Sequence, residues 1–326
     1  MRRLLTRAVA VPIRIPDSAI RNQSSAFVMI AARITPKVIW FGLALNLCAW
    51  LAVHLPWRAG LTPRLWVIEG AIRTGFLCLA YMLALALNLV IAAEYRETRW
   101  LRVAWLALAA NSGVSIVRII VESSLFNLIW PGYTRDPLWG LLQHLAIAPA
   151  NAFLLFGLLA MWWAYHQVGL GFAIEKRDYA AIAGIMLLLV GLMVIREGLS
   201  EARSPYQTSR WLQLIGLALL SFSAAASLAT HRMAAQMGGG KLAVALRLLT
   251  LYTLLRGVLV LIQAGQRMSL MDGGSTSATY SISIGLCWQS VPWIAALAAA
   301  YRAEMIVHAA RELKQQRAAK AVLASV

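Results

Sequence analysis

One apolar stretch of the chain carries four polar residues at the spacing of a single helical face. They recur at steps of four, three and four residues and are Asn111, Ser115, Arg118 and Glu122. A helix places residues at these steps on one side, with Arg118 and Glu122 in the register in which opposite charges pair. The residues around them are apolar enough for a lipid environment, and a charged face cannot be turned toward lipid. The pattern predicts a polar interior between membrane helices.

Three other apolar stretches also carry charge. These residues are Glu69 and Arg73, Arg196 and Glu197, and Arg256, which follows Tyr252 by one turn. At 1.5 Å per residue, Arg118, Arg196 and Arg256 lie about 20 to 24 Å from the ends that we assign to the cytoplasm. Arg73 lies about 9 Å from the outer end of its own helix. Four helices would therefore carry charge in the outer third of a membrane.

Two interpretations fit these four arginines and three glutamates. The groups can neutralise one another, or reach the headgroups on their long stems, and act only as clamps between helices. Alternatively, the surplus guanidinium receives an anionic or polar ligand in a water-accessible pocket. We favour the clamp for Glu69 and Glu197. The residues predicted to bind ligand are Arg73, Asn111, Ser115, Arg118, Glu122, His144, Tyr252 and Arg256. Additional polar candidates for the same cavity are Gln143, Asn151, Gln289 and Ser290.

Residues for catalysis or metal binding are scarce. The apolar stretches contain no aspartate, and the chain contains neither HExxH nor GxSxG. The five histidines lack metal-ligand spacing. No lysine lies within an apolar stretch, which excludes a retinal Schiff base. We therefore predict no catalytic residue, no metal, no cofactor and no enzyme activity.

The elements that would position these residues are eight apolar stretches, each near the 20 residues needed to cross a bilayer. Hydrophobic residues make up 60% of the 326-residue chain and charged residues 13%. This composition predicts an all-α, polytopic membrane helix bundle. The stretches cover residues 38–55, 67–93, 103–122, 140–165, 179–199, 211–230, 242–262 and 282–302.

Lysine and arginine predict the orientation of these stretches. Nineteen of them lie on the side that holds both termini and six on the other, which assigns both termini to the cytoplasm. The net charge of +17 then reflects topology and affinity for anionic lipids, without nucleic-acid binding. The predicted organisation is a basic cytoplasmic arm at 1–37, a transmembrane bundle at 38–302 and a cytoplasmic juxtamembrane helix at 303–326.

The C-terminal segment carries a resemblance. Its sequence, RELKQQRAAKA from Arg311 to Ala321, resembles the connector helix that joins multi-span sensor regions of bacterial histidine kinases and diguanylate cyclases to their output domains. The resemblance implies that the bundle senses a ligand, the membrane state or a partner, and that the last helix transmits this signal.

These observations together predict a membrane sensor or receptor-like module, in which a polar pocket is coupled to the C-terminal helix. The alternatives are a secondary transporter of a small anionic solute and a structural subunit of a membrane complex. The expected partners are membrane lipids, a small polar or anionic ligand, and a second copy or another membrane protein. The expected location is a bacterial inner membrane.

Overall fold

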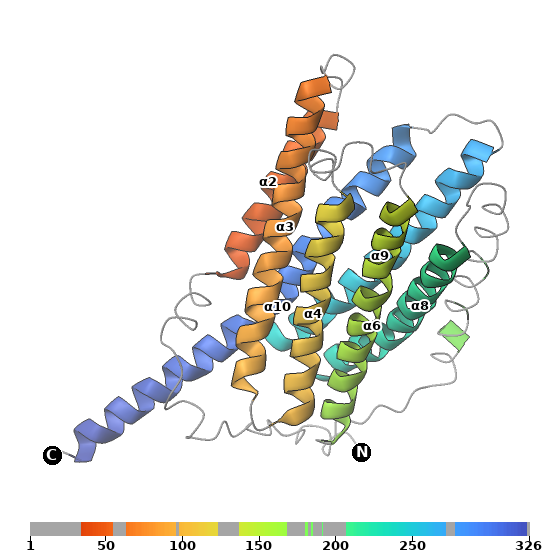
Figure 1. Cartoon of the computed structure of the whole chain (residues 1–326). Coiled ribbons are helices and arrows are strands. Elements are labelled where there is room, and N and C mark those ends of the chain that lie inside the picture. Colours follow the sequence, from red (N-terminus) through yellow and green to blue (C-terminus); the bar gives the residue numbers. More distant parts are fainter. Residues whose placement is uncertain are drawn as a thin grey trace.

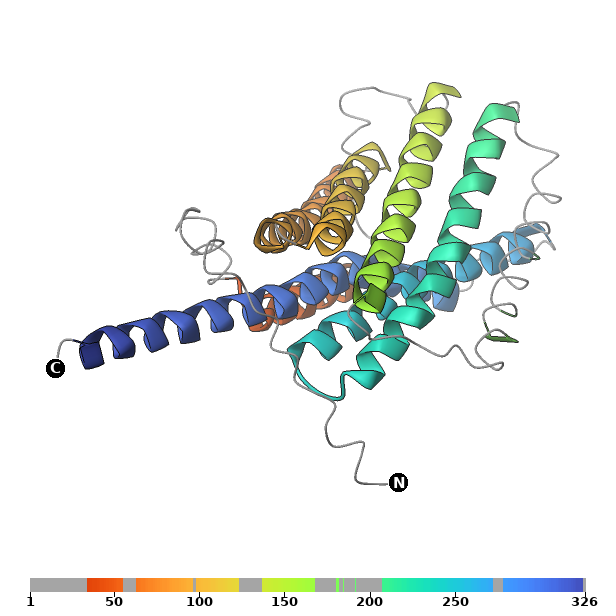
Figure 2. The same cartoon turned by 90° about the horizontal axis from the view of Figure 1, so that it is seen from below.

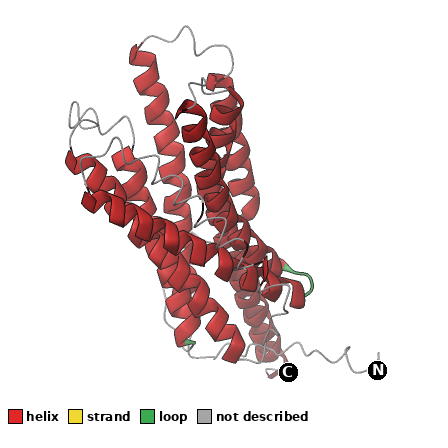
Figure 3. Cartoon of the chain, turned by 90° about the vertical axis from the view of Figure 1, so that its right-hand side faces the viewer, coloured by secondary structure: helices red, strands yellow, loops and turns green. Residues whose placement is uncertain are grey.

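The described part of the chain is helical apart from short turns, and it contains no strand (Figure 3). This computed structural model describes residues 34–54, 63–95, 98–122, 137–167, 207–271 and 278–324, with single positions between 180 and 191. The helices are α2 (Pro36–His54), α3 (Pro63–Glu94), α4 (Arg99–Glu122), α6 (Pro137–Gln167), α8 (Gln207–Gln236), α9 (Lys241–Met271) and α10 (Ala278–Ala324).

The predicted all-α class is confirmed. Seven of the eight predicted stretches coincide with these helices, while the stretch at 179–199 lies almost wholly outside the described residues. Four helices, α3, α4, α6 and α9, are long and apolar enough to cross a membrane, and α2 is apolar but shorter. This finding is consistent with an integral membrane protein. The count of eight spans and the side of the termini remain predictions.

Proline and glycine mark several of the helix ends. Pro36, Pro63 and Pro137 are the first residues of α2, α3 and α6, the position where the missing N–H of proline costs nothing. The turn between α8 and α9 contains Gly238 and Gly240 with φ angles of 72° and 105°, a left-handed conformation that only glycine adopts without strain. These residues make α8 and α9 antiparallel neighbours.

Six helices form a closed ring. Around it, each helix packs against the next in the order α3, α4, α6, α8, α9 and α10, and α10 returns to α3. Helix α2 lies outside this ring and packs mainly against α10 (Figures 1 and 2). The side chains that face the centre of this ring therefore determine what the bundle can bind.

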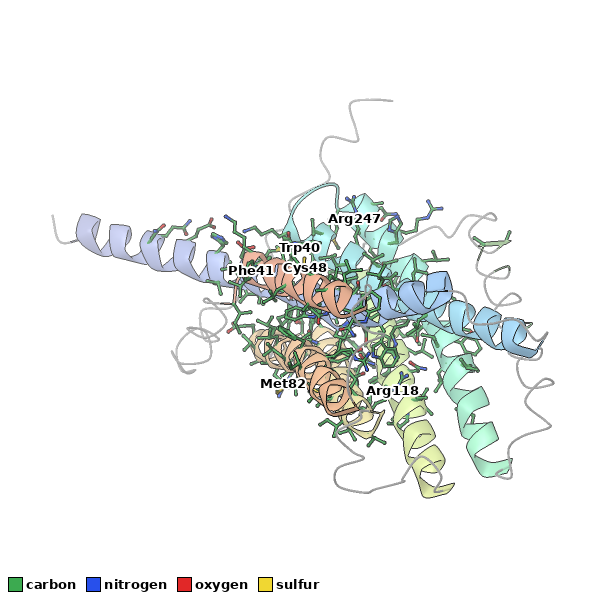
Figure 4. All side chains as sticks on the ribbon, turned by 90° about the horizontal axis from the view of Figure 1, so that it is seen from above. Trp40, Phe41, Cys48, Met82, Arg118 and Arg247 are labelled. Carbon is green, nitrogen blue, oxygen red and sulfur yellow. The ribbon has the colours of Figure 1, made fainter. Side chains whose placement is uncertain are left out.

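The surface and the interior have opposite character. Large apolar side chains are exposed on the perimeter, including Phe41 of α2 at 70%, Val117 of α4 at 56% and Phe156 of α6 at 50%. Figure 4 shows Phe41 and Met82 on opposite outer sides of the bundle. Asparagine, serine, threonine and arginine side chains are buried instead. A water-soluble bundle shows the reverse arrangement, so this surface suits lipid.

Helix α2 is attached to α10 by two tryptophan–glycine contacts. The Trp293 ring of α10 lies where a Cβ on Gly42 would be, and the Trp50 ring of α2 lies where a Cβ on Gly285 would be. Between these contacts, the Asn46 side-chain amide donates to the Gln289 side-chain oxygen at 3.1 Å. The absence of a side chain at each glycine lets the two helices approach closely.

We expect Gly285→Ala to lower the free energy of unfolding by about 1 to 3 kcal/mol, because the new methyl group must displace the Trp50 ring. Gly75→Ala on α3 is the matched control, since a Cβ there meets nothing within 4 Å. The control should be neutral or slightly stabilising, because alanine favours helix more than glycine does. Unfolding in mild detergent measures both changes, and equal effects would contradict the interlocking of α2 with α10.

Helix α10 extends far beyond the ring. It is one helix of 47 residues, which corresponds to about 70 Å at 1.5 Å per residue. Its C-terminal part projects away from the other helices (Figures 1 and 2). Just before it leaves, Glu304 forms an ion pair with Lys241 of α9 at 2.8 Å. The segment that follows this ion pair is called the tail below.

Candidate functional site

A network of hydrogen bonds fills the centre of the ring. The guanidinium of Arg256 donates from Nη1 to the Tyr252 hydroxyl at 2.8 Å and from Nη2 to Asn151 Oδ1 at 2.5 Å. The Tyr252 hydroxyl donates in turn to Asn111 Oδ1 at 2.7 Å. All four of these side chains are at least 90% buried. The network joins α4, α6 and α9.

The network also extends to backbone carbonyls. The Asn111 amide donates to the carbonyl of Ala150 on α6 at 2.6 Å, and the Asn151 amide donates to the carbonyl of Gly216 on α8 at 2.7 Å. Each asparagine therefore uses both ends of its amide. Tyr81 of α3 is also buried and lies within electrostatic range of Tyr252 and Arg256. Side chains of α4, α6 and α9 thus form the network, and α8 meets it through a carbonyl.

Arg256 and Tyr252 reach across the ring to helices that are not their neighbours. Among the described residues, no Cα atom of α9 comes within 8 Å of a Cα atom of α4 or α6. The long side chains of Tyr252 and Arg256 bridge this gap. The position of the ring helices opposite α9 therefore depends on polar contacts with one buried charge.

That charge has only neutral partners among the described residues. Among the described residues, the acceptors of the Arg256 guanidinium are the Tyr252 phenol and the Asn151 amide. Arginine stays protonated in proteins. A buried cation without a counter-charge is costly in a medium of low dielectric. An anion bound at Arg256 would therefore supply a counter-charge that its described partners do not.

The other predicted site residues divide into three groups. Ser115 is buried on α4, one turn beyond Asn111. Arg118 and Arg73 are half-buried and have interactions of their own, and the Arg118 guanidinium lies 5.0 Å from the centre of the Trp288 ring on α10. Arg118 lies among the helices in Figure 4, whereas Arg247 lies at the edge of the bundle. The side chains of Glu122 and His144 lie outside the described residues, as do those of Glu69, Arg196 and Glu197.

The network lies deeper than the sequence predicts. Asn111 and Asn151 are near the midpoints of α4 and α6, so the Arg256 guanidinium that binds Asn151 lies at mid-height of these helices. Counting residues placed Arg256 in the outer third. The difference arises because α9 continues to Met271, beyond its predicted stretch, so that Arg256 is the middle residue of the helix. Its guanidinium also reaches back to Tyr252 one turn before it.

Two members of the site gave weaker signals in the sequence. Asn151 was only an additional candidate, because a single asparagine in an apolar helix more often joins two helices than binds a ligand. Tyr81 gave only a weak signal, because its polar neighbours on the same face, Thr74 and Asn88, are two turns away in an otherwise apolar run. Gln289, considered for the same pocket, bonds instead with Asn46 of α2.

The arrangement can bind and orient an anion through preorganised donors. The guanidinium already has its orientation fixed by two acceptors, which lowers the ordering cost of binding. The described residues include no cluster of three or more His, Cys, Asp or Glu side chains that could hold a metal ion. Cys48, Cys78 and Cys287 form no disulfide. No protein-family model, curated protein or solved structure matches this chain.

Proposed function

We propose that the chain is an integral membrane receptor-like module, in which a small anion binds at Arg256 and changes the tilt or rotation of the C-terminal helix. The observation that carries the proposal is the burial of the Arg256 guanidinium at the centre of the ring, with neutral acceptors only among the described residues. In a membrane protein, an ionisable side chain buried between the spanning helices is by default a candidate for a functional role. A bacterial inner membrane with both termini in the cytoplasm is part of the proposal.

A physical route from Arg256 to the tail supports sensing. Helix α9, which carries Arg256, packs along α10, and the Arg118 guanidinium of α4 lies over the Trp288 ring of α10. Because α10 is one continuous helix, a tilt or rotation set at Trp288 reaches the tail without crossing a loop. An anion that binds at Arg256 more tightly in one arrangement of α9 against α10 than in another would shift the population toward that arrangement.

The test uses a label on the tail. Cys48, Cys78 and Cys287 are replaced by alanine, and the exposed Gln315 is changed to cysteine and spin-labelled in the full chain in nanodiscs. We expect at least one anion among phosphate, acetate and succinate to change the spectrum. Arg256→Met should abolish this response, whereas Arg247→Gln should leave it intact, because Arg247 is an exposed arginine on the same helix.

Two outcomes would overturn the proposal. One is a spectrum that no anion changes, and the other is a response that survives Arg256→Met. Proteoliposomes provide the complementary measurement, because a transporter would accumulate the labelled anion in the lumen. Accumulation that is lost with Arg256→Met would replace the receptor by the transporter.

A further inference from the structure

A second buried arginine, Arg302, lies at the end of the bundle where α10 leaves the ring. Arg302 is 6% exposed, and its Nε atom has no hydrogen-bond partner. Its Nη1 atom donates only to the thioether sulfur of Met305 at 3.5 Å, and a thioether is a weak acceptor. The Nε donor of this guanidinium is therefore unsatisfied, and its Nη1 donor has only a weak acceptor.

The neighbour of Arg302 is unsatisfied as well. The guanidinium carbon of Arg302 lies 5.1 Å from the centre of the Tyr95 ring at the end of α3. Tyr95 is 8% exposed, and its hydroxyl also has no hydrogen-bond partner. Two buried donors from different helices thus lie together with no acceptor between them. Unsatisfied buried polar groups of this kind are rare in folded proteins.

The acidic residue closest in sequence on α10 is engaged elsewhere. The Glu304 carboxylate pairs with Lys241 at 2.8 Å and lies 3.7 Å from His308. Exposed basic residues lie at this end of the ring, among them Arg99 and Arg247. Their field draws anions toward Arg302.

We propose that Arg302 and Tyr95 form a binding site for a phosphate group at the base of the tail. The planar guanidinium matches two phosphate oxygens, and the phenol adds a third donor. The phosphate belongs to an anionic lipid headgroup or to a soluble phosphate, because basic pockets between helices at the cytoplasmic side suit either source. Occupancy of this site would fix the point at which the tail leaves the ring. It is separate from the Arg256 site and does not depend on it.

The experiment measures the thermal midpoint of the full chain in phosphatidylcholine nanodiscs, with phosphatidylglycerol or with inorganic phosphate added. A ligand that binds the folded state raises the midpoint. We expect Arg302→Gln to weaken the apparent affinity for the stabilising species about tenfold or more, which corresponds to one charged hydrogen bond. Arg102→Gln, an exposed arginine at the same end, should keep the wild-type response.

The two additions separate the sources. Stabilisation by phosphatidylglycerol alone assigns the site to a lipid, and stabilisation by inorganic phosphate assigns it to a soluble ligand. The proposal fails if neither species raises the wild-type midpoint, or if the two arginine variants respond alike. Should Arg302→Gln not fold, Tyr95→Phe decides the question, because it removes only the hydroxyl. An affinity unchanged in that variant would overturn the site.

Discussion

Asn151→Leu is expected to lower the free energy of unfolding by about 3 kcal/mol. The substitution removes the oxygen that accepts from Arg256 Nη2 and the amide that donates to the Gly216 carbonyl. The buried guanidinium is then left with the Tyr252 hydroxyl as its only acceptor among the described residues. Losing the partner of a buried charged donor costs more than losing a neutral hydrogen bond. Reversible unfolding in bicelles measures the change.

The matched control is Asn111→Leu, which removes the same amide from the same network on α4. Its partners are the Tyr252 hydroxyl and the Ala150 carbonyl, and neither is charged. Hydrogen bonds between neutral groups of membrane helices contribute only about 1 kcal/mol. If Asn111→Leu costs as much as Asn151→Leu, the charge of Arg256 is not what makes the network necessary.

Combining Asn151→Leu with Arg256→Met is expected to recover about 2 kcal/mol relative to Asn151→Leu alone. The double variant replaces a charge and its acceptor by apolar side chains, which is often neutral or stabilising in a buried site. The two substitutions should therefore be strongly non-additive, as for residues in direct contact. The same unfolding titration, made on the wild type, both single variants and the double variant, provides the coupling energy.

The double variant also separates stability from function. A restored fold without any anion response in the tail would mean that the ring tolerates an apolar centre and that Arg256 is kept for binding. Additive losses would contradict the direct contact between Asn151 and Arg256. A restored fold with an intact anion response would move the binding site elsewhere.

Much of the fold follows from hydropathy. In lipid the backbone must satisfy its own hydrogen bonds, so each apolar stretch predicts a helix, and seven of them coincide with helices here. The helix ends are less predictable, because helices continue past the apolar window: α9 reaches Met271, nine residues beyond its predicted stretch. The order of helices around the ring was not predictable, since lipid-facing and buried faces are both apolar.

The candidate site was predictable in part. The periodic spacing on α4 identified Asn111 and Ser115 as inward-facing, and the pair of Tyr252 and Arg256 one turn apart identified α9 as the partner. The sequence emphasised pairing between arginine and glutamate, whereas the acceptors of Arg256 in the described residues are Tyr252 and Asn151. Contacts that cross the ring depend on tertiary arrangement. Arg302 and Tyr95 were missed because they lie at the end of the apolar stretch 282–302 and just past the end of the stretch 67–93, where a charged or amphipathic residue usually reaches water.

The most direct test of the central claim is an experimental density map of the full chain purified in nanodiscs, at a resolution that defines side chains. The claim is that the Arg256 guanidinium takes its counter-charge from a bound anion. We predict non-protein density in contact with that guanidinium, inside the ring and beside Asn151 and Tyr252. A carboxylate of the chain itself paired with Arg256, with no density for another molecule, would contradict it.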